Sequence, residues 1–303
     1  MKPQVTVIIV TFNVKDLTRN CLNSIIKPNE NLQIIVSDNG SVDGTVEMVK
    51  KEFPNVLVLD NKENLGFAKA NNKARKFCQG DYILILNPDT VVEKDTIKAC
   101  LEYIKKDKKI GALTCKIDLW SGGLDKDSRR SFPTPFIALT HFSFLDRIFP
   151  KSKVFSRYWY GYLSEDTIHK IDVPQGAFCL IRKAVMDKVD WYDEDYFLDG
   201  EDIDLAYKIK QLGYKIIYYP KVRIIHYKGA SKGKKVSGQH TKVDPQVRKR
   251  ALSSGVEAMK IFYKKHYIHK YPWILNKLVF VGIDIIKTLR LLMFHLKSLY
   301  TRY

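Results

Sequence analysis

The feature that most constrains the fold is a short apolar run, Ile83–Leu86, that stops abruptly before Asn87, Pro88 and Asp89. Because the run has no polar alternation, it predicts a strand that is buried on both faces, as in a parallel sheet. Pro88 has no N–H and cannot extend a central strand, so the strand must end before it. Asp89 then follows the carboxyl end of a strand, where ligands bind in open α/β sheets, although an Asp there can also form a turn or cap a helix.

The N-terminal part of the chain alternates strand-like and helical patterns. Continuous apolar runs predict strands, and the segments between them repeat apolar residues at helical spacing. Short connections between the two patterns indicate βαβ units, and therefore a mostly parallel sheet that is flanked by helices. The strands predicted before Ile83–Leu86 are Val5–Val10, Gln33–Val36 and Val56–Leu59.

Polar side chains follow three of the predicted strands. Thr11 and Asn13 follow the first strand, Asp38 follows the second, and Asp89 follows the fourth. The carboxyl ends of parallel strands meet at one edge of a sheet, which is where a nucleotide would lie. The turn after Asp38 is not a P-loop because it lacks Gly-Lys-Ser/Thr, and one of its residues can equally cap the following helix.

A second acidic cluster precedes a predicted helix. Glu201 and Asp202 open this helix, and Gly213 is expected at its end. Carboxylates in a first helical turn are favoured by the helix dipole, so simple capping is one interpretation. The other is that a carboxylate here acts as a general base, which takes a proton from a hydroxyl nucleophile.

Two later stretches also carry candidate ligands. His226 ends an apolar run, and such a His is either a satisfied structural residue or a metal ligand. The basic, glycine-containing segment 227–235 includes Lys228 and Lys232 and can fold over a diphosphate. Residues 110–175 are interrupted by Gly and Pro and are expected to be irregular, as lids and substrate loops often are.

The charge is distributed very unevenly. The chain has 51 Lys+Arg and 33 Asp+Glu, a net charge of +18, and residues 205–303 hold 22 of the basic and 3 of the acidic residues. The last third therefore carries +19, and the remaining 29 basic and 30 acidic residues leave residues 1–204 at −1. This asymmetry predicts an anionic partner such as a lipid surface, a nucleic acid or a phosphorylated substrate, or else a solvated face.

The cysteines and the N-terminus bear on the compartment. The five cysteines are far apart in sequence and odd in number, which fits neither a disulfide framework nor a zinc site. The N-terminus lacks the long apolar segment of a secretory signal, because polar residues interrupt it early. We therefore expect a cytoplasmic protein.

The C-terminal segment, Trp273–Tyr300, has a helical pattern with one apolar face. Asp284, Lys287 and Arg290 interrupt it, so it is a poor membrane-spanning helix. A basic amphipathic helix with aromatic residues is typical of an anchor that lies in the plane of a membrane surface. The alternative is a helix that packs on the domain or on a second subunit, as in a homodimer.

Taken in order, the motifs resemble those of the family 2 glycosyltransferases, which have the GT-A fold. The resemblance covers about residues 3–235, and its ordered set of motifs is more specific than any one of them. The Asn-Pro-Asp, Arg-Arg-Ser-Phe-Pro and Glu-Asp-Ile-Asp-Leu sequences most resemble the rhamnosyltransferase-like subgroup, which uses dTDP-L-rhamnose. The motifs begin at Val7, Asp38, Asn64, Asn87, Gln175, Gly200 and His226.

The resemblance implies which residues bind the nucleotide-sugar donor. Thr11 and Asn13 would border the nucleotide, Asp38 would contact the base, and three residues near the start of the third helix would lie near the ribose and phosphates. The full donor set is Thr11, Asn13, Asp38, Asn64, Lys69, Asn71, Asn87 and Asp89.

The resemblance also implies a metal site and a catalytic base. Asp89 and His226 would bind a divalent ion, Mg²⁺ or Mn²⁺, and Asn87 stands where the family's Asp-x-Asp motif has its first Asp. Asp202 matches the family's general base, with Glu201 supporting it. Contacts to phosphate or acceptor are expected from Arg130, Lys228 and Lys232.

The expected organisation is a Rossmann-like GT-A α/β domain over residues 1–235, with a C-terminal amphipathic helical extension over 236–303. Residues 1–115 would form the nucleotide-binding half, and residues 116–235 the acceptor and catalytic half. The expected activity is inverting transfer of a sugar, by best match L-rhamnose, to a hydroxyl of a saccharide or lipid-linked acceptor in bacterial-type cell-surface polysaccharide synthesis. The enzyme would be peripheral on the inner face of the cell membrane.

Other interpretations stay open. The donor can instead be a UDP- or GDP-sugar, because donor choice depends on the shape of the pocket. A nucleotidyltransferase would need a glycine-rich basic loop after the first strand, which the sequence lacks. The charge alone also fits a basic protein that binds nucleic acid or an anionic surface, but no nucleic-acid-binding module is recognised and we expect no nucleic-acid partner. The intact acidic motifs argue against an inactive scaffold protein.

Overall fold

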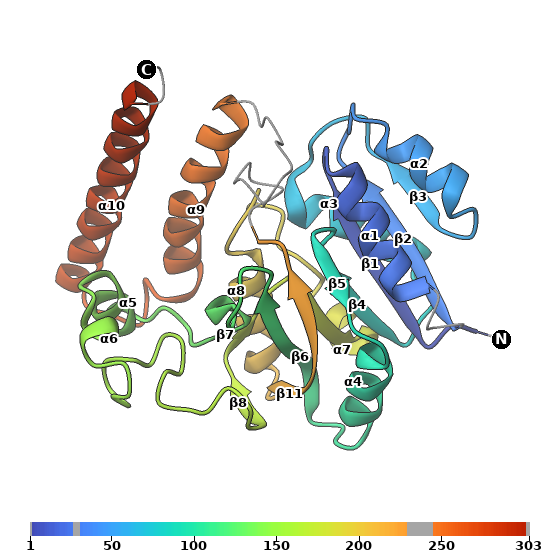
Figure 1. Cartoon of the computed structure of the whole chain (residues 1–303). Coiled ribbons are helices and arrows are strands. Elements are labelled where there is room, and N and C mark those ends of the chain that lie inside the picture. Colours follow the sequence, from blue (N-terminus) through green and yellow to red (C-terminus); the bar gives the residue numbers. More distant parts are fainter. Residues whose placement is uncertain (1, 27–30, 229–244, 301–303) are drawn as a thin grey trace.

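A large mixed sheet of nine strands runs through the computed structural model, which describes residues 2–26, 31–228 and 245–300 (Figure 1). Its order is β3-β2-β1-β4-β10-β6-β11-β5, and β8 pairs with β11. The strands of this sheet are β1 Val5–Thr11, β2 Leu32–Asp38, β3 Leu57–Asp60, β4 Tyr82–Leu86, β5 Thr90–Val92, β6 Ile110–Leu119, β8 His169–Ile171, β10 Phe178–Arg182 and β11 Lys215–His226.

Helices cover both faces of the sheet, and a small second sheet, β7 with β9, lies outside it (Figure 1). The helices that precede β6 along the chain are α1 Lys15–Ile26, α2 Thr45–Glu52, α3 Gly66–Ala74, η1 Arg75–Phe77 and α4 Thr96–Lys105. The remaining elements are η2 Lys126–Ser128, β7 Arg129–Arg130, α5 Pro135–Phe142, α6 Leu145–Ile148, β9 Val173–Pro174, α7 Lys183–Lys188, α8 Glu201–Gln211, α9 Pro245–His266 and α10 Trp273–Tyr300.

The N-terminal half of the sheet is parallel, as its apolar runs predict. All five residues of β4 are buried, because α1, α2 and α4 pack on one face of the sheet and α3, α7 and α8 on the other. β1 lies between β2 and β4, with both pairs parallel. The carboxyl ends of these strands therefore meet at one edge, where the polar connections begin.

The sheet turns mixed beyond β4. β10 runs antiparallel to both β4 and β6, and β11 is parallel to β6 but antiparallel to β5 and β8. β11 is one long strand with a register shift between Tyr219 and Arg223, where the sequence pattern breaks. Its far end pairs His226 with Thr90, which brings β11 to the residues that follow β4.

Residues 110–175 are more regular than expected. Their first ten residues form β6, a buried strand, and residues 135–148 contain the helices α5 and α6. β6 was missed because Gly111, Thr114 and Lys116 interrupt its apolar pattern, yet most of these positions are buried by neighbouring strands. Much of the rest of this segment is irregular, as predicted.

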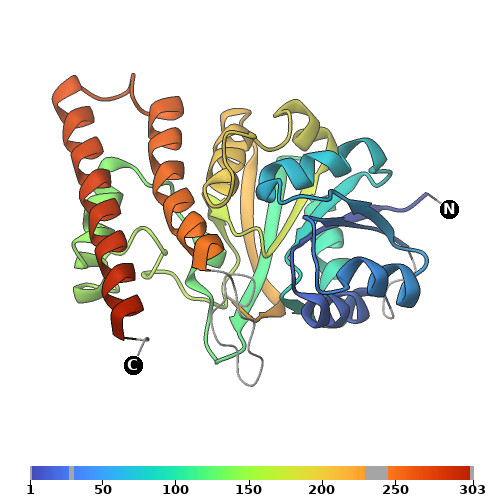
Figure 2. The same cartoon turned by 90° about the horizontal axis from the view of Figure 1, so that it is seen from above.

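The C-terminal helix α9 packs beside α8 and α10 packs beside α9, away from β1–β3 (Figure 2). α9 contacts α8 through an aromatic cluster that includes Tyr207, Phe262 and Tyr267. α10 matches the predicted helical segment, and within the described residues no helix is long and apolar enough to cross a membrane. The apolar face of α10 points away from the domain, since its residues Leu278, Ile285, Leu289 and Leu292 are exposed.

Candidate active site

The strand ends of the parallel half bring the predicted nucleotide-binding residues together. Thr11 and Asp38 are register partners at the ends of β1 and β2, and Asn39 N–H donates a hydrogen bond to the carbonyl of Thr11 at 2.9 Å. The Thr11 hydroxyl lies 2.9 Å from the hydroxyl of Thr18 in the first turns of α1. The sheet edge is therefore held by contacts within its own connections.

Asp38 is buried, and its two carboxylate oxygens have different surroundings. Oδ1 accepts hydrogen bonds from the N–H groups of Gly40 and Ser41 at 3.0 and 2.8 Å, whereas Oδ2 is buried without a hydrogen-bond partner among the described residues. Burial raises the pKa of Asp38, and the hydrogen bonds from the turn offset this only in part. A buried acceptor of this kind fits an N–H group of a ligand.

Asn13 joins the first two connections. It has a left-handed backbone (φ 53°), its N–H donates to the Ser41 hydroxyl at 2.8 Å, and its Oδ1 accepts from the N–H of Val42 at 2.8 Å. Asn tolerates this conformation better than most residues. The connections after β1 and β2 are thereby fixed to each other at the predicted nucleotide site.

Three residues that are predicted to bind the nucleotide-sugar donor lie at or near α3, in different environments. The Asn64 side chain accepts a hydrogen bond from the N–H of Gly66 at 3.0 Å at the start of the helix. Asn71 is buried, donates to the carbonyl of Phe67 at 2.9 Å, and keeps a buried Oδ1 without a partner among the described residues. Lys69 is exposed, and it is the one charged residue of the three.

Asp89 and His226 are brought together by the pairing of β5 with β11. Both are buried, and His226 Nε2 lies 3.3 Å from Asp89 Oδ1. The other ring nitrogen, Nδ1, lies 3.0 Å from Asp125 Oδ2. Burial lowers the pKa of His226, but the hydrogen bonds with the two carboxylates outweigh it and raise the pKa to about 9.

Asp125 and Asp127 contact the predicted site residues His226 and Lys228, and sequence reasoning missed them. Lys228 Nζ lies 2.6 Å from Asp125 Oδ1 and 2.5 Å from Asp127 Oδ2. Burial raises the pKa of Asp125, but His226 and Lys228 outweigh it and lower the pKa to about 2. The Asp-x-Asp spacing just before Arg129 and Arg130 was the available signal, but it lies in the segment expected to be irregular.

The donors around Asp89 fit a divalent cation. Asp125 on Nδ1 leaves Nε2 of His226 facing Asp89, as in metal-binding histidines whose other ring nitrogen is held by a carboxylate, and an ion bound there would displace the proton on Nε2. Carboxylate oxygen and imidazole nitrogen suit Mn²⁺ or Mg²⁺, and a diphosphate would supply further oxygens. In the described part of the chain, no group of three or more His, Cys, Asp or Glu side chains is placed so that it could hold a metal ion by itself.

Asp202 lies in the first turn of α8 and pairs with Arg130 of β7. The Arg130 guanidinium donates to Asp202 Oδ2 and, at 3.3 Å, to the carbonyl of Pro174. Both side chains are largely buried. Glu201 is buried beside it. The predicted base is therefore held in place by the largely buried guanidinium of Arg130.

The short segment of residues 125–130 contributes to both acidic groups. Burial raises the pKa of Asp127, but the charges of Arg130 and Lys228 outweigh it and lower the pKa. Lys228 connects Asp127 to Asp125, which holds His226. The structure thus brings Arg130 and Lys228 into the site, where both contact carboxylates of the chain itself.

The remaining predicted residues are less informative. Asn87 is half-buried, and its carbonyl accepts a hydrogen bond from the Thr90 hydroxyl at 2.7 Å, which shapes the turn after β4. Lys232 lies outside the described residues.

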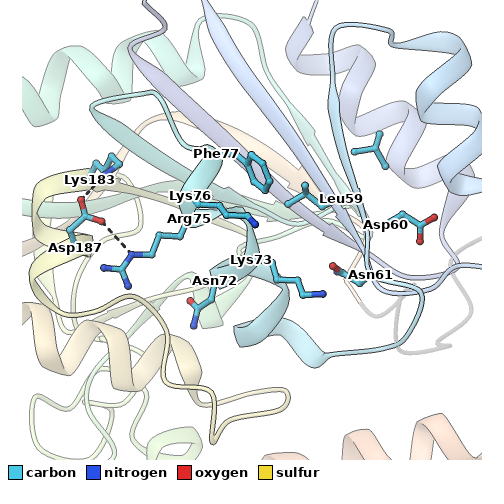
Figure 3. Close-up of a pocket in the computed structure, with 11 residues that line it drawn as sticks. Leu59, Asp60, Asn61, Asn72, Lys73, Arg75, Lys76, Phe77, Lys183 and Asp187 are labelled. Carbon is cyan, nitrogen blue, oxygen red and sulfur yellow. Dashed lines mark hydrogen bonds and ion pairs between the residues drawn. The ribbon is translucent and has the colours of Figure 1, made fainter.

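A cavity of about 840 Å³ lies elsewhere, beside the edge strand β3, and none of the predicted site residues lines it (Figure 3). Arg75 and Lys183 both pair with Asp187 at its rim, as Figure 3 shows. We therefore take the residues described above, and not this cavity, as the candidate active site.

Comparison with solved structures defines the class of protein. The fold is similar to that of a mannosyltransferase from Pyrobaculum calidifontis solved with GDP-Man and Mn²⁺ (TM-score 0.54, 17% identity, covering 100% of this chain and 89% of that one). It is also similar to GalNAc-T7 solved with UDP, GalNAc and Mn²⁺ (TM-score 0.58, 17% identity, 86% and 48%) and to Staphylococcus aureus TarS residues 1–349 solved with UDP-GlcNAc (TM-score 0.51, 17% identity, 86% and 66%). The fold is therefore the GT-A fold of glycosyltransferases.

Comparison of sequences gives the family. Residues 6–190 match the family model described as "Glycosyl transferase family 2", and the chain belongs to that family. It is 27% identical to the N-acetylglucosaminyl-diphospho-decaprenol L-rhamnosyltransferase of Mycobacterium tuberculosis over 67% of this chain and 69% of that one. It is 27% identical to the rhamnosyltransferase WbbL of Escherichia coli over 74% and 83%. The predicted family, fold class and glycosyltransferase activity are confirmed.

Proposed function

We propose that this glycosyltransferase moves L-rhamnose from dTDP-L-rhamnose to a hydroxyl of a lipid-linked saccharide, in cell-surface polysaccharide synthesis. The observation that carries the proposal is that residues 125–130 contribute to both acidic groups: Asp125 contacts His226, which faces Asp89, and Arg130 contacts Asp202. The rhamnosyltransferases with similar sequences support the choice of sugar, and the lipid diphosphate in the name of the mycobacterial relative supports the class of acceptor.

The nucleotide would lie across the ends of β1, β2 and β4. The unpartnered Oδ2 of Asp38 would accept a hydrogen bond from an imide N–H, which thymine and uracil both carry. Asn13 and the turn after Asp38 would hold the ribose side of the ligand. A pyrimidine nucleotide is therefore our first choice, and a UDP-sugar is the alternative that the same contact allows.

Asp89 and His226 would hold Mn²⁺ or Mg²⁺ together with the donor diphosphate. A bound divalent ion would stabilise the negative charge that develops on the departing nucleoside diphosphate. Asp125 fixes the orientation of the His226 ring. Lys228, which is exposed and pairs with Asp125 and Asp127, adds a second positive charge close to this position.

Asp202 would remove the proton from the acceptor hydroxyl. A carboxylate must be free to receive that proton, so Arg130 has to yield part of its contact when substrates bind. An incoming phosphate competes for the guanidinium, because Arg forms paired hydrogen bonds with phosphate as it does with carboxylate. One direct displacement would invert the anomeric centre, and it needs no second nucleophile.

The C-terminal region would place the enzyme on a membrane surface. Exposed apolar residues of α10 follow each other at spacings of three or four positions, which puts them on one face of the helix. They are Ile274, Leu278, Val281, Ile285, Leu289 and Leu292. Together with the net positive charge of the last third of the chain, this face fits a peripheral anchor on an anionic leaflet, and a homodimer through the same face is the alternative.

A transfer assay tests the proposal. Purified full-length protein is incubated with Mn²⁺, a polyprenyl-diphosphate-linked N-acetylglucosamine acceptor, and dTDP-L-rhamnose, UDP-sugars or GDP-sugars in turn. We expect transfer from dTDP-L-rhamnose, with inverted anomeric configuration by NMR, and no transfer by Asp202→Asn. Transfer from another donor alone would replace the proposed sugar, and transfer with retained configuration would contradict the role of Asp202.

A further inference from the structure

The helices α5 and α6 and the loop after them present an apolar surface that the catalytic domain does not cover. Leu139 on α5 is 63% exposed and Ile148 on α6 is 64% exposed. Exposed apolar residues gathered in so short a segment usually mark an interaction surface. The exposed apolar residues of this surface, the α5–α6 surface, are Phe136, Leu139, Phe142, Phe144, Ile148, Phe149 and Val154.

The exposed charges of the same segment are all positive. Residues 135–160 contain a single acidic residue, Asp146, which is buried and pairs with His141 at 2.7 Å. The guanidinium of Arg147 lies over the Phe144 ring at 4.6 Å. The exposed basic residues of the segment are Arg147, Lys151, Lys153 and Arg157. Aromatic and basic side chains without exposed acids match the interface of an anionic bilayer.

This surface is linked to the segment that carries Arg130 through Tyr158 and Trp159. His141 of α5 packs against the rings of Tyr158 and Trp159, with centroids 4.5 and 4.6 Å apart. The carbonyl of Tyr158 accepts a hydrogen bond from the N–H of Ser131, next to Arg130, at 2.8 Å. Trp159 Nε1 donates to Asp127 at 3.2 Å. α5 therefore packs directly on the segment that holds the partner of Asp202.

We propose that the α5–α6 surface docks on an anionic membrane beside the acceptor entrance. An acceptor whose lipid stays in the bilayer would then present its diphosphate to Arg130 and its sugar hydroxyl to Asp202. This inference rests on the proposed function, in which the acceptor is lipid-linked. α5, α6, α9 and α10 lie on the same side of the molecule in both views, so one membrane plane can contact both regions (Figure 1, Figure 2).

Vesicle binding by the full-length protein tests the proposal. The variant Leu139→Ser/Ile148→Ser removes two exposed side chains from the α5–α6 surface, and Leu57→Ser/Leu212→Ser, with exposures of 37% and 48%, is the control outside it. Flotation is measured with phosphatidylcholine vesicles that contain or lack phosphatidylglycerol. We expect binding only to the anionic vesicles, weakened by at least about tenfold in the first variant and unchanged in the control.

Parallel measurements separate this inference from the proposed function and from other occupants of the surface. The affinity for the donor nucleotide in the presence of Mn²⁺, measured by calorimetry, should be equal in the wild type and all variants. If the wild type does not bind the nucleotide, the proposed function is refuted instead. The inference is wrong if Leu278→Ser/Ile285→Ser on α10 abolishes vesicle binding while Leu139→Ser/Ile148→Ser does not weaken it. It is also wrong if the latter substitutions only convert a dimer to a monomer in size-exclusion chromatography.

Discussion

His226 depends on a carboxylate that lies 101 positions earlier in the chain. One carboxylate oxygen of Asp125 contacts Nδ1 of His226, and the other accepts a hydrogen bond from Lys228. The orientation of the Asp125 carboxylate is therefore set from two sides. Partners of this kind usually fix the orientation of a metal-binding His ring. The role proposed for Asp89 and His226 therefore extends to Asp125.

Asp125→Asn should weaken Mn²⁺ binding in the presence of nucleotide by about 10–100-fold, because Asn no longer supplies the charged acceptor that orients the His226 ring. Titration of Mn²⁺ followed by electron paramagnetic resonance measures this. Asp166→Asn, at an exposed carboxylate that pairs with Lys116, is the control and should bind Mn²⁺ like the wild type. Equal affinity in the two variants would remove Asp125 from the site.

Asp202 is the residue on which the proposed chemistry depends. Asp202→Asn should lower kcat by about 10²–10⁴-fold, since general base catalysis typically contributes this much. The donor Kd should change little, because Asp202 contacts Arg130 rather than the strand ends that would hold the nucleotide. Steady-state kinetics and calorimetry measure the two quantities, and a variant that binds the donor poorly but turns over normally would contradict the assignment.

At the scale of elements, α9 packs against the turn that precedes Glu201 and Asp202, the residues proposed to be catalytic. Gly200 precedes α8 and has φ 91°, and a Cβ added there would lie 2.7 Å from the Cβ of Ala258 on α9. The close approach of the two elements therefore requires glycine. The C-terminal region is part of the support of the active site as well as a proposed anchor.

Gly200→Ala should destabilise the protein by about 2–4 kcal/mol, which combines backbone strain with overlap against α9. Gly213→Ala is a matched control, because Gly213 has φ 80° and nothing within 4 Å of an added Cβ. It should cost only the backbone strain, about 1–2 kcal/mol. Urea denaturation measures both, and equal losses would show that the contact with Ala258 does not matter.

The sequence was most informative about elements where local pattern and environment agree. The run Ile83–Leu86 is buried on both faces and ends where Pro88 requires. β6 was missed because neighbouring strands, and not its own pattern, decide its burial. The helical nature of residues 135–148 was likewise not expected.

The residues proposed for the site stay predictions, and the sequence signals for them were unequal. The acidic groups at strand ends were identified because parallel strands bring such positions to one edge. Asp125 contacts His226, and Lys228 joins Asp125 to Asp127. These contacts depend on the path of residues 116–130 in the fold, which no periodicity in the sequence reports. The pairing of Arg130 with Asp202 is also a tertiary contact, between residues 72 positions apart.

At the scale of the whole molecule, ion pairs join the C-terminal helices to the catalytic domain. His266 of α9 lies 2.6 Å from Asp204 of α8, and Lys265 contacts Asp193 and Asp195. Burial raises the pKa of Asp204, but His266 and Lys208 outweigh it and lower the pKa. The contact between α8 and α9 therefore depends on an ionised carboxylate.

This dependence predicts a pH effect on stability. Because the pKa of Asp204 is lower in the folded chain than its ordinary value of 3.8, its ionised form stabilises the fold above that pH. The contribution is lost as the pH falls through the folded-state value. The free energy of unfolding of the wild type should therefore fall more steeply with acidification than that of Asp204→Asn, as measured by urea denaturation from about pH 7 to about pH 3. Parallel curves would show that Asp204 does not contribute.

The most direct test of the central claim is calorimetric titration of dTDP into the wild type and Asp89→Asn, each with and without Mn²⁺. If the edge of the sheet holds a metal and a donor nucleotide, the wild type should bind dTDP more tightly with Mn²⁺. Asp89→Asn should lose at least about tenfold in affinity and most of the dependence on the metal. Binding that is the same in both proteins and indifferent to Mn²⁺ would contradict the assignment of this site.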